Sequence, residues 1–195
     1  MIAQVNSWDE QLVLWVNAQH TDFLDQLMWG LSSKWLILPL LLMLLFLLRV
    51  QLKSWKEMAM LLLFGTLMII LCDVISTQLF KEVFHRFRPS HNLHIAEQLH
   101  YHLFSDGSPY LGGKYGFVSS HAANFAGFVV FFWPFFHKRW IQVVLSILVL
   151  LIMYSRMYLG VHYFTDVFVG ALLGMCIAYG MRRFVLTRFV KMDER

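Results

Sequence analysis

The stretch YGFVSSHAANFAGFVVFF, residues 115–132, places two serines and a histidine directly before a long apolar run. The run covers residues 118–136 and is close to the length of about 20 residues that a helix needs to cross a bilayer. A histidine at the mouth of such a segment is costly unless it is used. His121 is therefore a candidate functional residue.

Four further apolar runs occur along the chain, at residues 35–48, 58–80, 140–158 and 162–181. The chain of 195 residues is 58% hydrophobic and only 14% charged, which is too apolar for an ordinary soluble domain. The sequence therefore predicts an all-α fold, a polytopic membrane helical bundle with five transmembrane helices. The run at 35–48 reaches spanning length only if residues 28–34 extend it.

The first 33 residues have a different pattern. In SWDEQLVLWVNAQHTDFLDQLMWGL, residues 7–31, acidic side chains alternate with Leu, Val and Trp at near-helical spacing. We expect one or two amphipathic helices at the membrane surface, and a sixth, weakly hydrophobic span is the alternative. The chain thus divides into an N-terminal amphipathic segment (1–33) and a membrane domain (34–195) with a loop at 81–117. We expect no cleaved signal peptide, because the first ten residues lack a basic region followed by an apolar one.

Lysine and arginine are unevenly distributed over the predicted loops. Ten of the sixteen occur at residues 49–56, at residues 138–139 and in the tail after residue 181. With five spans these three segments share one side of the membrane, which the positive-inside rule makes cytoplasmic. We therefore expect a cytoplasmic C-terminus and an outward-facing 81–117 loop.

The other six lysines and arginines lie on the outer side in spite of this rule, and four of them lie close to the two histidine segments, namely Lys81, Arg86, Arg88 and Arg156. Snorkelling toward lipid headgroups would explain one such residue. Four of them on one membrane face indicate a shared negative ligand.

Two histidines lie on the same side as these cations. His162 and Asp166 are four residues apart at the start of a helix and share a face, so the carboxylate can hold a proton on Nδ1 and leave Nε2 free to attack. His121 begins another helix, which Ser119 can cap and whose N-terminus favours anions. The combination predicts a phosphoryl-transfer pocket in which one histidine attacks phosphorus and His121 protonates the leaving oxygen.

These residues also carry a family resemblance. KEVFHRFRP (81–89) resembles the K-x6-R-P motif of the type 2 phosphatidic acid phosphatase superfamily, the membrane lipid phosphatases related to vanadium haloperoxidases. SRMYLGVHYFTD (155–166) matches the family's S-R-x5-H-x3-D at every fixed position. FVSSH (117–121) resembles its P-S-G-H, with Val118 and Ser120 in place of proline and glycine. The three motifs occur in family order within residues 58–185.

The resemblance implies a role for each matching residue. Phosphate oxygens would be bound by three cations and two serines, namely Lys81, Arg88, Arg156, Ser119 and Ser120. His162 would form a phosphohistidine intermediate and Asp166 would orient it, while His121 would act as general acid and then help to activate water. Arg86 lies outside the fixed positions, so it would contact either a headgroup or another residue of the site.

The resemblance further implies an integral membrane lipid phosphatase that hydrolyses a phosphate monoester or diphosphate of a lipid, with no metal and no other cofactor. Family substrates include phosphatidic acid, phosphatidylglycerol phosphate, undecaprenyl diphosphate and lipid A phosphates, and the sequence does not choose among them. The expected partners are this lipid phosphate and the membrane lipids, with no nucleic acid, and the oligomeric state is open. The small size and short outer loop favour a bacterial inner membrane, with the active site facing the periplasm.

Three alternatives stay open: a lipid phosphate transferase, a catalytically inactive lipid-binding protein and a small transporter. The intact histidines and Asp166 argue against the second, and a transporter would need polar or broken helices near the midplane. The histidines between residues 91 and 102 invite a metal site, but their spacing is not that of zinc hydrolases, and we expect a surface loop. Cys72 and Cys176 are expected to be free packing residues.

Overall fold

The computed structural model describes residues 2–52 and 54–189, and all the regular elements within these ranges are helices. The longer ones are α1 (Ile2–Asn17), α2 (Asp22–Ser32), α3 (Ile37–Gln51), α4 (Trp55–Val74), α6 (Ser120–Phe132), α7 (Arg139–Tyr158) and α8 (Phe164–Arg188). The all-α prediction is confirmed. Lys53 and the tail cations beyond residue 189, which entered the charge argument, lie outside the described residues.

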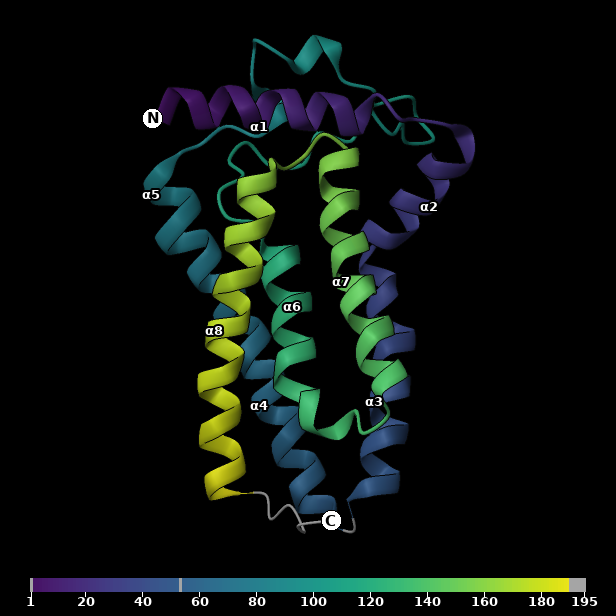
Figure 1. The fold of residues 1–195 in the computed structure, drawn as a ribbon, viewed down its shortest axis with the longest axis vertical. Coiled ribbons are helices and arrows are strands. Elements are labelled where there is room, and N and C mark those ends of the chain that lie inside the picture. Colours follow the sequence, from purple (N-terminus) through teal and green to yellow (C-terminus); the bar gives the residue numbers. More distant parts are fainter. Residues whose placement is uncertain (1, 53, 190–195) are drawn as a thin grey trace.

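Helices α3, α4, α6, α7 and α8 run side by side along the long axis of the molecule (Figure 1). Within the described residues, three helical stretches are long and apolar enough to cross a membrane, namely Trp55–Phe84, Arg139–Tyr158 and Phe164–Arg188. The other two predicted spans are helical but shorter than expected, because α3 has 15 residues and α6 has 13. Pro134 lies in the short 3-10 helix Trp133–Phe135 that follows α6, where its ring prevents the α-helical pattern from continuing.

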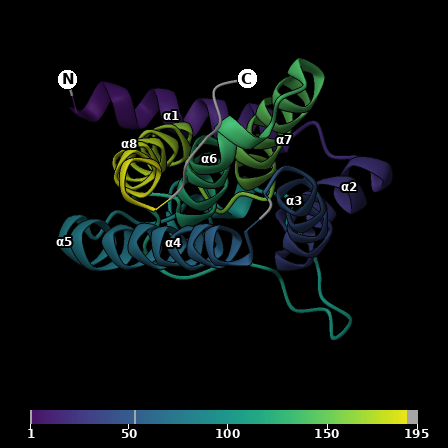
Figure 2. The same cartoon turned by 90° about the horizontal axis from the view of Figure 1, so that it is seen from below.

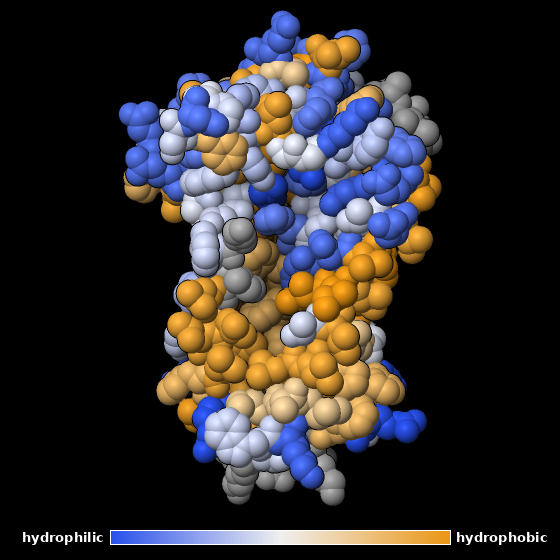
Figure 3. All heavy atoms as spheres, turned by 180° about the vertical axis from the view of Figure 1, so that it is seen from behind, coloured by the Kyte–Doolittle hydropathy of each residue, from blue (hydrophilic) through white to orange (hydrophobic). Residues whose placement is uncertain are grey.

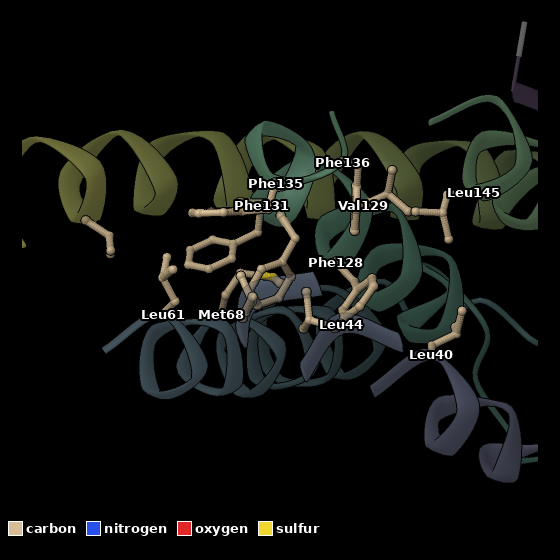
Figure 4. Close-up of a cluster of buried hydrophobic side chains, with 14 of the residues drawn as sticks. Leu40, Leu44, Leu61, Met68, Phe128, Val129, Phe131, Phe135, Phe136 and Leu145 are labelled. Atoms are coloured by element: carbon tan, nitrogen blue, oxygen red, sulfur yellow. The ribbon is translucent and has the colours of Figure 1, made fainter. Parts of the chain in front are cut away.

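The short helix α6 lies at the centre of the bundle, between α4, α7 and α8 (Figure 2). Most of its side chains are buried, and its phenylalanines fill the core together with Leu44, Leu61 and Met68 (Figure 4). At about 1.5 Å per residue α6 spans roughly 20 Å, less than the ~30 Å hydrocarbon core. Neighbouring helices enclose this backbone, and Gln51 Nε2 donates to the Phe135 carbonyl at 2.7 Å.

Glycines bring α6 and α8 into contact at the level of the backbone. A Cβ on Gly174 would lie 1.9 Å from the carbonyl oxygen of Ala123, and one on Gly170 would lie 2.5 Å from that of Ser119. Small residues at helix–helix contacts are typical of membrane bundles. Here they place the first turn of α6 against the first turns of α8.

The helix that begins at Trp55 changes its winding before it ends. After α4, residues Ile75–Lys81 form a π-helix, which continues into α5 (Glu82–Phe84). The stretch ends at His85, whose left-handed backbone (φ 47°) turns the chain into the loop before α6. π-helical turns are rare and frequent at functional sites, and this one carries Lys81.

Helices α1 and α2 cover one end of the bundle, which we call the upper end. Helix α1 lies across this end and α2 descends beside α7 (Figure 1). α1 buries Val13 and Val16 and exposes Trp8 and Trp15, and exposed tryptophans are typical of a membrane interface. The predicted N-terminal helices are therefore present, and their position at a membrane interface remains a prediction.

The surface of the bundle is divided by polarity. Figure 3 shows a hydrophilic upper end above a broad apolar band. The face in this view is formed by α3 and α4, which lie on that side of the bundle (Figure 2). The space-filling view shows a hollow with apolar walls on this face (Figure 3). Cys72 and Cys176 are both free, as predicted; Cys72 is buried and Cys176 is exposed.

Candidate active site

His162 lies in the short link between α7 and α8 and is only 2% exposed. Its Nε2 atom lies 3.0 Å from Arg88 Nη1. Because a guanidinium donates hydrogen bonds and accepts none, Nε2 must be the acceptor, and the imidazole proton of neutral His162 is on Nδ1. This is the tautomer in which Nε2 carries the lone pair needed for attack on phosphorus.

The charge state of His162 is set by its surroundings. Burial, followed by the positive charges of Arg88, Arg156 and Lys81, holds the pKa of His162 well below its ordinary value. The ring is therefore neutral at physiological pH. Arg88 is in direct contact with this ring.

Asp166, one turn after His162, is fully buried. Its Oδ2 lies 3.5 Å from His162 Nδ1 and accepts the backbone N–H of Tyr163 at 3.0 Å. The predicted His–Asp contact is thus present at ion-pair distance, while Nδ1 itself makes no hydrogen bond within the described chain. The backbone carbonyl of Asp166 accepts the N–H of Ser119 at 2.9 Å, which joins the start of α6 to α8.

Lys81 is the last residue of the π-helix that follows α4, and Arg88 lies in the loop after α5. Both side chains reach the site from there. Lys81 Nζ donates to Ser120 Oγ at 2.8 Å. The guanidinium of Arg88 donates to the carbonyls of Tyr115 and Val161, each at 3.1 Å. Burial and the charge of Arg156 lower the pKa of Arg88 to about 10, so this side chain stays positive at neutral pH.

Arg156, at the end of α7, is buried and contacts two hydroxyl groups. It donates to Ser32 Oγ at the end of α2 and to the Tyr110 hydroxyl at 3.1 Å, and its Nε has no partner among the described residues. The backbone of Ser32 also lies beside His121. Sequence reasoning missed Ser32 and Tyr110, because neither lies in a motif or at a distinctive spacing.

The start of α6 completes the arrangement. Ser119 is its N-cap, with Oγ accepting the N–H of Ala122 at 3.4 Å. Ser120, the first residue of the helix, accepts from Lys81, so the helix N-terminus lies beside a cation. The structure therefore brings together every residue that the sequence assigned to the site, namely Lys81, Arg88, Ser119, Ser120, His121, Arg156, His162 and Asp166. Such an arrangement of cations and histidines can bind a tetrahedral anion and present a nucleophile to it.

The loop histidines make other contacts. His100 Nε2 lies 2.9 Å from Asp25 Oδ2, and the His102 ring stacks on Trp29 with centroids 3.9 Å apart. Across residues 2–52 and 54–189, no group of three or more potential metal ligands is close enough to hold an ion. These histidines attach the loop to α2.

Comparison with known proteins identifies one family by sequence and a shared fold by structure. Residues 57–189 match the sequence model of the PAP2 superfamily. A lipid A 4'-phosphatase of Porphyromonas gingivalis is 32% identical over 171 residues, or 88% of this chain and 70% of that protein. Phosphatidylglycerophosphatase B of Bacillus subtilis is 31% identical over 141 residues, which cover 68% of this chain and 59% of that protein.

Two solved structures have the same fold. The crystal structure of a transmembrane PAP2-type phosphatidylglycerolphosphate phosphatase from Bacillus subtilis matches with a TM-score of 0.68 and 24% identity, covering 97% of this chain and 90% of that one. The crystal structure of LpxE from Aquifex aeolicus matches with a TM-score of 0.59 and 23% identity, covering 89% and 93%.

Proposed function

Since the chain belongs to the PAP2 superfamily and is a membrane lipid phosphatase, we propose that it hydrolyses a lipid phosphate in two steps through a phosphohistidine at His162. The observation that carries this proposal is the buried, neutral ring of His162, whose Nε2 faces a cationic pocket. A nucleophile in this state requires no deprotonation before attack.

In the first step, the lone pair of His162 Nε2 forms a bond to phosphorus and the bond from phosphorus to the lipid oxygen breaks. His121, as an imidazolium, gives its proton to that oxygen and becomes neutral. In the second step, water attacks phosphorus, His121 takes its proton and the N–P bond breaks. Inorganic phosphate leaves, and neutral His162 is restored.

Side chains of the protein would supply the electrostatic stabilisation in both steps. Lys81, Arg88 and Arg156 would bind the phosphoryl oxygens, together with the N-terminus of α6 and its two serines. The contacts of Arg156 to Ser32 and Tyr110 would then be exchanged for contacts to the substrate. These donors account for the developing charge, which supports a reaction independent of metal ions.

The exposure of the site residues supports entry from the side of the bundle. Lys81, Ser120 and His121 are partly exposed, whereas the rest of the pocket is buried. The apolar hollow on the face formed by α3 and α4 would let the lipid chains remain in hydrocarbon while the phosphate reaches the upper end (Figure 3). The lysines and arginines at the opposite end support an outward-facing site and a cytoplasmic C-terminus in a bacterial inner membrane.

The function can be tested with purified protein in detergent and a panel of lipid monophosphates and diphosphates. We expect release of inorganic phosphate, which persists in excess chelator and is inhibited by vanadate, with His162→Ala as the inactive control. The panel should include lipid A and phosphatidylglycerophosphate, the lipids for which the relatives are named. Transfer of phosphate to a second lipid would instead identify a transferase, and loss of activity in chelator with recovery in zinc or magnesium would contradict the mechanism.

A further inference from the structure

Arg86 lies between two fully buried carboxylates. Its Nη1 donates to Asp166 Oδ1 at 2.7 Å and its Nη2 lies 2.8 Å from Asp9 Oδ2. The guanidinium also lies over the ring of Tyr163, 4.2 Å from its centroid. Arg86 thus contacts the carboxylate that faces His162, on the oxygen that His162 does not use.

Asp9 connects this arginine to the N-terminal helix α1. Besides Arg86, the Asp9 carboxylate accepts the backbone N–H of Thr165 at 3.2 Å and the Thr165 hydroxyl. Thr165 lies in the first turn of α8, where N–H groups have no partner within the helix. A side chain outside the family match of residues 57–189 therefore holds the turn that follows His162.

The contacts of Arg86 distinguish it from the proposed phosphate-binding cations. Its terminal nitrogens are occupied by Asp9, Asp166, Thr165 and Asn6. Arg88, by contrast, directs Nη1 at His162 Nε2. Arg86 is therefore placed to act on Asp166 and not on the substrate.

Charge explains why such a residue is needed. Without Arg86, two carboxylates would be buried close together, and a buried carboxylate without a partner cation is strongly disfavoured. Asp166 would turn away or take up a proton. In either case His162 Nδ1 would lose the carboxylate oxygen that faces it at 3.5 Å.

We propose that Arg86, held by Asp9 of α1, is a positioning residue that fixes the charge and orientation of Asp166 and, through it, the orientation of His162. The inference rests on the proposed phosphohistidine mechanism. Helix α1 would then help to position the active-site residues, in addition to covering the upper end of the bundle.

The test compares Arg86→Ala with the unaltered protein on a lipid phosphate that the latter hydrolyses. We expect kcat to fall by about tenfold to a hundredfold, with little change in KM. This is the range typical of removing a group that orients a metal-binding side chain, and we expect a similar effect for the orientation of Asp166. Arg86→Lys should retain part of kcat, because it keeps the charge but not the two-sided contact. Asp9→Asn should lower kcat in the same way, and Glu10→Gln is its matched control, because Glu10 contacts Asn92 and not Arg86.

Chemical rescue separates positioning from a merely structural role. A cavity of about 360 Å³ borders Arg86, with Asn6, His85 and Tyr163 among its other lining residues. Guanidinium ions at millimolar concentration should enter it and restore kcat to Arg86→Ala, whereas sodium at equal ionic strength should not. The rate of His162 phosphorylation, measured by rapid quench, should recover in parallel.

Several outcomes would overturn the inference. One is an unchanged kcat in both Arg86→Ala and Asp9→Asn; another is a raised KM at constant kcat, which would make Arg86 a substrate contact. If Arg86→Ala does not fold, Arg86→Lys and Asp9→Asn carry the same test. An inactive unaltered protein would contradict the proposed function, whereas an active protein that is insensitive to Arg86 would remove this inference alone.

Discussion

At the scale of single residues, the two histidines of the site are held in different ways. His162 is buried between α7 and α8 with its lone pair directed at Arg88. His121 is half-buried in the first turn of α6, beside the backbone of Ser32. The more enclosed ring suits a nucleophile, and the more accessible ring suits a group that exchanges protons with a leaving oxygen and with water.

Substituting each histidine should therefore have a different effect. His162→Ala should remove the covalent route and leave no phosphoenzyme. His121→Ala should slow hydrolysis of a lipid phosphate by about 10²–10⁴-fold, the usual contribution of general acid–base catalysis. With an activated aryl phosphate, whose leaving group departs without a proton, the first step should be much less affected.

Rapid quench with labelled aryl phosphate measures this contrast. His121→Ala should accumulate an acid-labile, base-stable phosphoenzyme, because its second step also lacks a base. Label on a serine, or strong labelling of His162→Ala, would show that the roles are assigned wrongly.

The lowered pKa of His162 makes a prediction about pH. An unfolded chain takes up a proton on histidine near pH 6.5, whereas burial and the nearby cations keep the folded ring neutral below that value. Native stability should thus decrease as pH falls below about 6.5, while His162 phosphorylation continues until a lower pH. The rate of phosphoenzyme formation between about pH 5 and 8 tests this. In Arg88→Gln, the pH below which phosphoenzyme formation slows should rise toward the ordinary pKa of histidine. In Lys114→Gln, the control, this pH should not change.

At the scale of secondary structure elements, the contact between α6 and α8 determines the site's dimensions. α6 carries Ser119 and His121 at its start, and α8 begins directly after His162. The glycines of α8 let these two helix starts meet at the backbone. The relative position of the acid and the nucleophile therefore depends on residues that have no side chain.

Gly174→Ala should separate the two helices, because the added Cβ would lie 1.9 Å from the Ala123 carbonyl oxygen. Overpacking of this kind costs about 1–3 kcal/mol, so we expect a lower Tm and reduced activity in detergent. Gly180→Ala is the matched control on the same helix, since nothing lies within 4 Å of its Cβ position and alanine favours helix. Equal Tm values for the two variants would contradict the packing argument.

Sequence predicted these elements well where periodicity and composition are strong, and poorly where winding changes. The motifs located Lys81, but no pattern in Ile75–Lys81 predicts a π-helix, because its i→i+5 bonds depend on tertiary packing. The apolar run from residue 118 to residue 136 suggested a full span, although Pro134 was a visible reason to expect an earlier end. Ser32 and Asp9 contact residues that are distant in the sequence, so no local pattern predicts these contacts and only the fold reveals them.

At the scale of the whole molecule, the site and the proposed membrane-surface helix share the upper end of the bundle. The 85–119 loop, α1 and the start of α8 meet there, and the C-terminal end of α8 lies at the opposite end (Figure 1). If each long helix crosses the membrane once, the two ends of the bundle should face different compartments.

Cysteine labelling can test the orientation. In a background without Cys72 and Cys176, Ser105→Cys in the exposed loop should react with an impermeant thiol reagent in intact cells. Ser54→Cys, at the N-cap of α4, should react only after permeabilisation. The reverse pattern would place the site in the cytoplasm and direct the search to lipids of the inner leaflet.

The Arg88 N–H that points at His162 has a consequence for chemical selectivity. A membrane surrounds its proteins with acyl esters, and a neutral imidazole with an unoccupied lone pair is a nucleophile toward carbonyl carbon. In the free protein that lone pair accepts a hydrogen bond at 3.0 Å. A neutral ester would compete poorly for the guanidinium, whereas phosphate oxygens form stronger, charge-assisted bonds with it. Binding of a phosphate to Arg88 would thus free His162 Nε2 for the attack on phosphorus. The ester bonds of the surrounding phospholipids would stay intact.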